Sequence, residues 1–260
     1  MMRSKWDQRI RRADELAAAH PFAAEVLRFY SRISSLQKDL YLGMPAGLVR
    51  ETSDLRMLVP KFPGFLVSLA AAAPDPIAQC ARDLKGRDPS QWLEILMSFW
   101  DAAPRFQPEA GREAELVASI FLQPYAEYLA DRSGPMPARE TFGTCPFCAA
   151  RPVAGVLRQE GDGGKRSLIC ALCATEWNIG RIVCPACGEE TVEKLAVYTA
   201  EQFPHVRVEA CDTCRYYIKT VDLTKNGHAV PVVDELATIP LNLWAHQHGY
   251  VKLRANLLGI

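Results

Sequence analysis

The stretch Cys145-Pro-Phe-Cys148, with Cys170-Ala-Leu-Cys173, Cys184-Pro-Ala-Cys187 and Cys211-Asp-Thr-Cys214 after it, decides how the second half of this chain folds. Each of the four segments places two cysteines three positions apart, and eight of the nine cysteines belong to these pairs. The first and third segments begin 39 positions apart, and the second and fourth begin 41 positions apart. This near-constant period indicates two copies of one small module, each with a hairpin between its two Cys-x-x-Cys turns.

The cysteine spacing predicts metal centres. Within each copy, 21 or 23 residues separate the two Cys-x-x-Cys turns, a spacing typical of zinc-ribbon and rubredoxin-type sites in which four thiolates surround one ion. A unit of about 40 residues buries too little core to fold alone, so we expect the metal to supply folding energy. Zinc and a single iron suit such a closed site equally, and an iron–sulfur cluster is the less favoured alternative. The spacing also permits the turns to pair across the two copies. The eight predicted ligands of the two ions are Cys145, Cys148, Cys170, Cys173, Cys184, Cys187, Cys211 and Cys214.

Length, composition and charge describe an ordinary folded protein. The 260 residues (28.9 kDa) include 30 basic and 30 acidic side chains, so bulk electrostatics does not favour binding to nucleic acid or anionic membranes. The longest apolar run, residues 65–73, is shorter than the about 20 residues that span a bilayer. Residues 1–7 lead into a charged helix pattern rather than a secretory signal. We therefore expect a cytoplasmic protein without membrane insertion, in which paired cysteines bind metals rather than form disulfides.

The first 131 residues carry the apolar periodicity of helices. In residues 21–42, apolar side chains recur at spacings of three and four, which predicts one amphipathic helix. Asp88 and Pro89 are typical of a helix N-cap and of the first helical position. This half is therefore predicted to form an irregular bundle of five or six helices. Further helices are predicted over residues 65–73, 77–84 and 108–131.

The character of the sequence changes after this helical half. Turn residues at 161–164 and 201–204 predict hairpins inside the two modules, and the apolar pattern from residue 232 predicts a return to helix. The predicted fold class is α+β and multidomain, with a helical bundle before two tandem rubredoxin-like or zinc-ribbon modules. The predicted division is a helical domain 1–131, a Gly- and Pro-containing linker 132–144, module one 145–183, module two 184–225 and a C-terminal helical tail 226–260.

The side chains of the sequence do not indicate an enzyme. Closed four-cysteine sites leave no coordination position for a reactive water. Gly161-Asp-Gly-Gly164 lies in a predicted hairpin rather than ahead of a helix, so it is not interpreted as a phosphate loop. Arg9, Arg11 and Arg12 are interpreted as a solvated helix face, and Cys80 as a core residue. The five histidines are scattered along the chain and are expected to be exposed polar residues: His20, His205, His228, His246 and His248.

The net charge of the two modules argues against nucleic acid as their partner. Residues 145–225 contain ten basic and ten acidic side chains, and a divalent ion bound by four thiolates adds a net charge of about −2. The loaded modules are therefore acidic, whereas a ribbon that binds nucleic acid carries a basic face. Electron transfer and protein binding remain as candidate functions.

These motifs, in this order, resemble the formate dehydrogenase accessory protein family, FdhE. The resemblance rests on the four Cys-x-x-Cys segments and on their surroundings, namely Leu168-Ile-Cys170, Thr175-Glu-Trp177, Arg181-Ile-Val-Cys184 and Arg215-Tyr-Tyr217-Ile-Lys219. It continues through Pro231-Val-Val-Asp234, Gly249-Tyr250 and Asn256-Leu-Leu-Gly259, so it covers residues 145–260 and is weaker over the helical half. It departs from the family at Ala149, where a glycine is common in such turns.

The resemblance implies a helical domain followed by two rubredoxin-like modules, with the eight paired cysteines as metal ligands. It also implies a cytoplasmic factor without catalytic activity that binds the catalytic subunit of a respiratory formate dehydrogenase, a molybdenum- or tungsten-dependent enzyme, before export. In the family, the Cys-x-x-Cys motifs are linked to iron binding and to this interaction. The alternative that the residues leave open is a rubredoxin-like electron-transfer protein.

Overall fold

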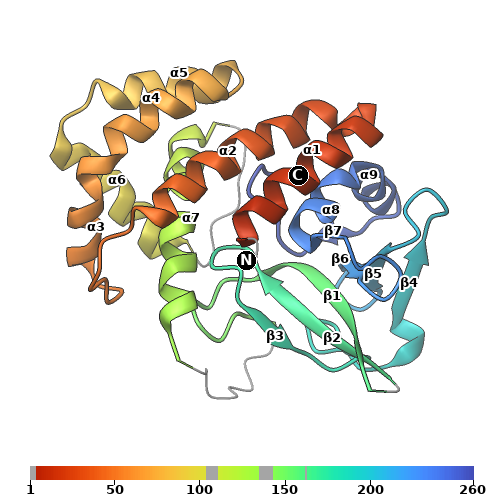
Figure 1. Ribbon diagram of the computed structural model, residues 1–260. Helices are drawn as coiled ribbons and strands as arrows, with labels where there is room; N and C mark the ends of the chain where they lie inside the picture. The colour runs from red at the N-terminus through yellow and green to blue at the C-terminus, as the bar shows by residue number, and fades with distance from the viewer. Residues whose placement is uncertain (1–3, 104–110, 135–142, 162) are drawn as a thin grey trace.

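A computed structural model of the chain describes residues 4–103, 111–134, 143–161 and 163–260. Its first half is helical, and its second half is a mixed sheet with two C-terminal helices (Figure 1). The helices are α1 (Lys5–Ala19), α2 (Ala24–Leu42), α3 (Thr52–Leu58), α4 (Phe62–Ala72), α5 (Asp75–Lys85), α6 (Pro89–Ala102), α7 (Glu113–Arg132), α8 (Pro231–Ala237) and α9 (Ile239–Gln247), with 3₁₀ turns η1 (Pro21–Ala23), η2 (Val59–Lys61) and η3 (Val192–Lys194). The strands are β1 (Pro152–Glu160), β2 (Gly163–Cys170), β3 (Glu176–Asn178), β4 (Leu195–Thr199), β5 (Val206–Cys211), β6 (Tyr216–Asp222) and β7 (Val251–Lys252).

Local signals set the helix boundaries. The side chain of Asp88 accepts hydrogen bonds from the backbone N–H groups of Ser90 and Gln91, and the Gln91 side chain accepts from the Asp88 N–H. This capping box satisfies backbone donors that the first turn of a helix leaves free. The predicted start of α6 is thus confirmed, as is the helix over residues 21–42, which begins with the η1 turn. Residues 104–110, where the prediction began the helix now seen as α7, lie outside the described residues.

Apolar side chains from α2 to α7 form the core of the helical half. Phe62 and Phe65 of α4 pack against Phe121 of α7, with ring centroids 4.8 and 5.2 Å apart. The segment Ser53–Ala72 is long and apolar enough to cross a membrane by length and composition, with a mean hydropathy of 1.3. Its helices are separated by the η2 turn, and its buried apolar residues belong to this core.

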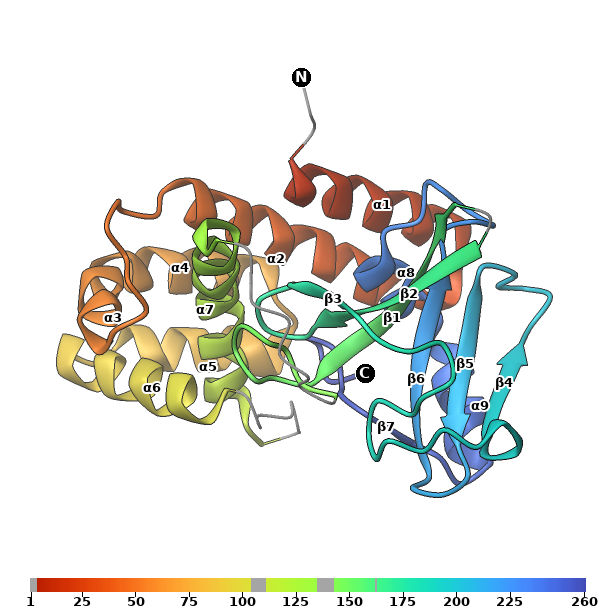
Figure 2. The ribbon, with the colours of Figure 1, turned by 90° about the horizontal axis from the view of Figure 1, so that it is seen from below.

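The two cysteine-containing modules share one sheet. In the described residues the strand order is β3-β2-β1-β6-β5-β4, and β7 pairs with β6. The β1–β2 and β4–β5 hairpins are antiparallel, as predicted, whereas β1 and β6 pair in parallel, with Gly155 opposite Thr220. A side chain at position 155 would place its Cβ 2.2 Å from Thr220 Oγ1, so the close approach of these strands requires glycine. Figure 2 shows the hairpins meeting along β1 and β6.

The C-terminal helices connect the sheet to the helical half (Figure 1). Val233 and Leu236 of α8 pack with Leu16 of α1 and Leu27 of α2. Helix α9 covers one face of β4–β6, because Leu241 and Ala245 share a core cluster with Val208 and Tyr217. Helices α8 and α9 thus lie within residues 231–247 of the predicted helical tail, whereas Val251 and Lys252 form strand β7. The division of the chain at residues 131, 144, 183 and 225 stays a prediction, and residues 135–142 of the predicted linker lie outside the described residues.

Ion pairs join α1 to α7 within the helical half and to α8 of the C-terminal region. Arg9 is 7% exposed, and its Nη1 donates to Glu127 Oε1 at 2.8 Å. Arg12 Nε donates to Asp234 Oδ2 of α8 at 3.0 Å. The interpretation of this arginine group as a solvated helix face is therefore wrong for both residues and holds for the exposed Arg11. The prediction fails because an arginine is buried where a carboxylate pairs with it, and the carboxylates that pair with Arg9 and Arg12 lie far away in the sequence.

Candidate metal centres

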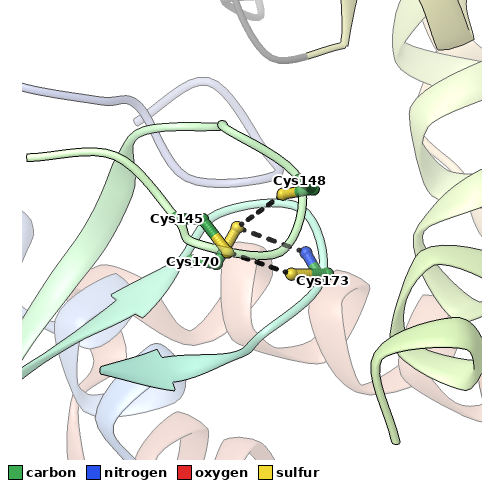
Figure 3. Close-up of side chains that lie close together, drawn as sticks. All are labelled: Cys145, Cys148, Cys170 and Cys173. Carbon is green, nitrogen blue, oxygen red and sulfur yellow. Dashed lines mark hydrogen bonds between the residues drawn. The ribbon is translucent and has the colours of Figure 1, made fainter. Parts of the chain in front are cut away.

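The first cysteine cluster, here called centre 1, contains Cys145, Cys148, Cys170 and Cys173. Their sulfur atoms all lie within 4.8 Å of one another, with Cys145–Cys173 at 3.6 Å and Cys148–Cys170 at 3.3 Å (Figure 3). Four thiolates about 2.3 Å from one ion stand about 3.8 Å apart in a tetrahedron. The four cysteines are free and buried, so their geometry and chemistry fit a bound zinc or iron ion.

The second cluster, centre 2, contains Cys184, Cys187, Cys211 and Cys214, again within 4.8 Å of one another. The Cys184–Cys214 and Cys187–Cys211 sulfur distances are both 3.7 Å, close to the tetrahedral value of about 3.8 Å. The structure therefore groups the turns within each module, which resolves the cross-pairing that the spacing left open. This donor set fits the same ions as centre 1.

All four Cys-x-x-Cys turns close in the same way. The residue after the second cysteine has a positive φ at Ala149 (64°), Ala174 (54°), Gly188 (84°) and Arg215 (60°). In three of the turns its N–H donates to the carbonyl of the first cysteine, at 2.8–3.0 Å. Only one of these residues is glycine, and the left-handed conformation costs other residues about 1–2 kcal/mol. The turn geometry thus overrides local preference, and the absence of glycine at Ala149 does not disturb the turn.

Backbone donors point at the sulfur atoms. The N–H groups of Leu172 and Cys173 approach Cys170 Sγ at 3.4 and 3.5 Å, and the Ala186 N–H approaches Cys184 Sγ at 3.4 Å. Such donors favour the thiolate form, which is the form that binds metal. This arrangement follows from the two-residue spacing, because the turn directs its own amides towards its first cysteine.

The protonation of centre 1 is shared among its sulfur atoms. The pKa of Cys145 lies below its ordinary value because the thiols of Cys148, Cys170 and Cys173 donate hydrogen bonds to its thiolate. The pKa of Cys173 lies above its ordinary value, first because its thiol donates to Cys145. Four adjacent negative charges repel one another, so full deprotonation of the cluster requires a cation.

The two centres differ in their surroundings. Every cysteine of centre 1 is 5% exposed or less and belongs to the core cluster of the helical half. That half also contacts both of its turns, because Arg50 Nη1 donates to the Phe147 carbonyl at 2.6 Å and Gln123 Nε2 to the Ala171 carbonyl at 3.3 Å. In centre 2, by contrast, Cys187 is exposed. Centre 1 is thus built into the core, whereas centre 2 lies at the surface.

Direct contacts fix the two modules against each other. Arg166 of β2 is 4% exposed, and its Nε and Nη2 donate to Glu209 Oε2 of β5 at 3.0 and 2.6 Å. Its Nη1 donates to the carbonyls of Gly180 and Val183, just ahead of centre 2. A Cβ at Gly143, just ahead of centre 1, would lie 1.9 Å from the Pro185 carbonyl oxygen. The two centres therefore belong to one packed unit.

Sequence reasoning missed one charged residue beside centre 1. Arg254 is buried, its Nη2 donates to the Ala103 carbonyl at 3.3 Å, and burial lowers its pKa to about 10. Its positive charge interacts favourably with Cys170 and Cys148, which favours their thiolate forms. A single arginine in the tail has no sequence pattern that would reveal this contact.

The other candidate side chains do not gather into a site. His205 Nε2 lies 2.8 Å from Asp234 Oδ1, and the His248 ring stacks on Trp244. Cys80 is half-buried beside the helical core, in accord with its interpretation as a core residue. Across the described ranges, centres 1 and 2 are the groups of three or more His, Cys, Asp or Glu residues with metal-binding geometry.

Comparison with known proteins gives the same family for both halves of the cysteine-rich region. Residues 144–181 match the family described as "FdhE, central domain", and residues 182–258 match "FdhE, C-terminal domain". The crystal structure of the FdhE protein from Pseudomonas aeruginosa superposes with a TM-score of 0.74 at 25% identity, and the match covers 99% of this chain and 97% of that one.

Curated relatives extend the match into the helical half. The FdhE homolog of Pseudomonas aeruginosa is 30% identical over 235 residues, which is 86% of this chain and 74% of that protein. The homolog of Pseudomonas putida is 25% identical over 97% of this chain and 86% of its own length. The homolog of Aquifex aeolicus is 32% identical over 140 residues, so the match spans half of that protein. These matches show that the chain belongs to the FdhE family of formate dehydrogenase accessory proteins.

Proposed function

We propose that this protein is a cytoplasmic maturation factor that binds the catalytic subunit of a respiratory formate dehydrogenase before export. We also propose that centres 1 and 2 each hold one iron or zinc ion through four cysteines, in paired turns of the rubredoxin-like or zinc-ribbon type. The observation that carries this proposal is the pair of complete four-sulfur clusters in a chain of this family. Closed clusters stabilise a fold and leave no coordination position for substrate, which suits a binding protein rather than an enzyme.

The two ions have different tasks in this proposal. At centre 1, the ion would hold the β1–β2 module against the helical half, because Arg50 and Gln123 contact the two turns that bind it. At centre 2, the ion would hold a surface that faces solvent and stays open to the client protein. A divalent ion at each centre neutralises part of the thiolate charge and converts a marginal small module into a stable one.

A protein partner suits the charge of this half better than nucleic acid does. The ten basic and ten acidic side chains of residues 145–225 leave the loaded modules with a negative net charge, since each four-thiolate centre contributes about −2. Affinity for nucleic acid depends mainly on neutralising phosphates with basic side chains. The catalytic subunit is therefore the proposed partner.

A deletion strain tests this function. Without this protein, the host should still make the formate dehydrogenase polypeptide but should show little formate oxidation in the membrane. Wild-type protein should restore the activity, as should the control variant Cys80→Ser, because Cys80 lies outside both centres. The variant Cys184→Ser/Cys187→Ser should not restore it. Unchanged formate oxidation in a deletion host without a second copy of the protein would refute the proposal.

The exposure of Cys187 favours a second candidate, a rubredoxin-like electron carrier, because electron exchange is fastest at a centre near the surface. Voltammetry of protein purified without air separates the two functions. A reversible one-electron couple at centre 2, together with rapid exchange with a redox partner, would support the carrier. A centre without redox activity, in a protein that captures the catalytic subunit, would support the maturation factor.

A further inference from the structure

A cavity of about 210 Å³ lies beside centre 2, on the face of β4–β6 opposite α9. Strand alternation creates this division, because Val206 and Val208 of β5 pack with α9 while Arg207, Glu209 and Cys211 line the cavity. Figure 2 shows α9 behind these strands and the segment before β4 in front of them. The cavity thus has the sheet as its floor and a loop as its wall, with centre 2 at one end.

The rim of this cavity is apolar and exposed. Ile182 is 53% exposed, Val192 is 61% exposed and Val197 is 53% exposed, and all three line the cavity. The buried Ile218 of β6 also lines the cavity. A cluster of exposed aliphatic side chains around a concave surface is typical of a protein-binding site, whereas single exposed aliphatic residues are common anywhere on a protein.

The charges in the cavity are unbalanced. Arg166 and Arg207 share one carboxylate, because both guanidinium groups donate to Glu209. Arg181 Nε donates to the Gly164 carbonyl at 2.8 Å, and within the described part of the chain no carboxylate pairs with Arg181. Three arginines and one glutamate therefore line the cavity, and the part of the cavity that these arginines line attracts an anionic group.

The neighbouring strand supplies a means of holding a polypeptide. Strand β4 is at the edge of the sheet in the described residues, and its Leu195 and Val197 line the cavity. The outer edge of such a strand presents N–H and C=O groups that pair readily with an added strand. Main-chain pairing along β4 would therefore bring the side chains of a bound segment to the mouth of the cavity.

We propose that the cavity and the β4 edge form the docking groove for an extended segment of the client protein. That segment places an aliphatic or aromatic side chain between Ile182 and Val197, and a carboxylate against Arg181 and Arg207. This inference rests on the proposed function, because it assigns the surface by which the maturation factor recognises its client. It also explains why centre 2 lies at the surface, since the ion there shapes one end of the groove.

The test compares groove variants with matched controls in binding to the purified catalytic subunit, measured by biolayer interferometry. Ile182→Asp, Val192→Asp and Arg181→Glu should each raise the Kd at least tenfold while metal content and circular dichroism stay as in the wild type. The controls are Leu243→Asp, at a 61% exposed position on α9, and Lys225→Glu, at an exposed lysine outside the cavity. Both controls should bind within twofold of the wild type.

Amide hydrogen exchange gives an independent readout of strand addition. Exchange over Leu195–Thr199 should slow when the catalytic subunit is bound, because its N–H groups gain partners. Unchanged exchange there, or groove variants that bind within twofold of the wild type, would overturn the groove while leaving the proposed function intact. Wild-type protein that does not bind the subunit would overturn both. A dimer of this chain that the same variants dissociate would assign the groove to a second copy and overturn its assignment to the client.

Discussion

The substitution Gly155→Ala tests whether the two modules depend on their shared sheet. The new Cβ would lie 2.2 Å from Thr220 Oγ1 and 3.1 Å from Thr220 Cβ. Thr220 is completely buried, and β1 and β6 lie inside the sheet with neighbours on both sides. Neither strand can therefore move away without losing other pairings, and the overpacking should cost about 1–3 kcal/mol of the free energy of unfolding.

The same contact predicts a rescue. Thr220→Ala removes the Oγ1 and Cγ2 atoms that crowd position 155, and it also removes a buried hydroxyl that has no hydrogen-bond partner among the described residues. The gain from removing an unsatisfied group, about 1–3 kcal/mol, offsets much of the loss of packing. The double variant should therefore be more stable than Gly155→Ala alone, with a coupling energy of at least about 1 kcal/mol.

Differential scanning calorimetry at a fixed scan rate measures these effects. A loss of about 2 kcal/mol should lower the apparent Tm by about 4–8 °C in a protein of this size. Gly164→Ala in β2 is the matched control, because its new Cβ would meet the flexible end of the Arg181 side chain at 3.1 Å and the Arg158 carbonyl oxygen at an ordinary contact distance of 3.7 Å. An unchanged Tm for Gly155→Ala, or a double variant whose loss equals the sum of the single losses, would refute this account of the β1–β6 junction.

Three further predictions concern the turns and the ions. Gly143→Ala should lower stability by more than about 3 kcal/mol, because its Cβ would meet the Pro185 backbone and its φ is +67°; a Tm within 2 °C of the wild type would contradict this. Ala149→Gly and Ala174→Gly should each raise stability by up to about 1 kcal/mol in urea unfolding, because they relieve left-handed strain; a loss of stability would show that the turns are unstrained. A chelator should release the ions in two phases, and Cys187→Ser should abolish the fast phase, since centre 2 is the exposed centre; loss of the slow phase instead would reverse the assignment.

Local sequence signals predicted the features that depend on neighbouring residues. The two-residue spacing within each cysteine pair sets the turn and identifies its two cysteines as ligands. Which turns meet at one centre is known only from the folded arrangement. The start of α6 at Asp88 and the β1–β2 hairpin around Gly161 follow from capping and turn preferences of the same local kind. For this reason the eight cysteines of the two centres could be named from the sequence.

Contacts between residues that are far apart in the sequence could not be predicted. Gly155 and Thr220 are 65 positions apart, and a parallel strand pair has no turn to reveal it. Arg9 and Glu127 are separated by 118 positions, so the sequence alone predicts a solvated helix face around Arg9. The cavity beside centre 2 likewise depends on Arg166, Arg181 and Arg207, which meet only once both modules share the sheet. Such contacts become visible only when the arrangement of the elements is known.

Native mass spectrometry of protein purified without air tests the central claim most directly, because it counts and identifies the ions on each chain. The wild type should carry two ions, the control Cys80→Ser should also carry two, and Cys148→Ser and Cys187→Ser should each retain one. This pattern would establish two independent four-cysteine centres. Wild-type protein without bound metal, or an unchanged count of two ions when all eight paired cysteines are replaced by serine, would contradict the account.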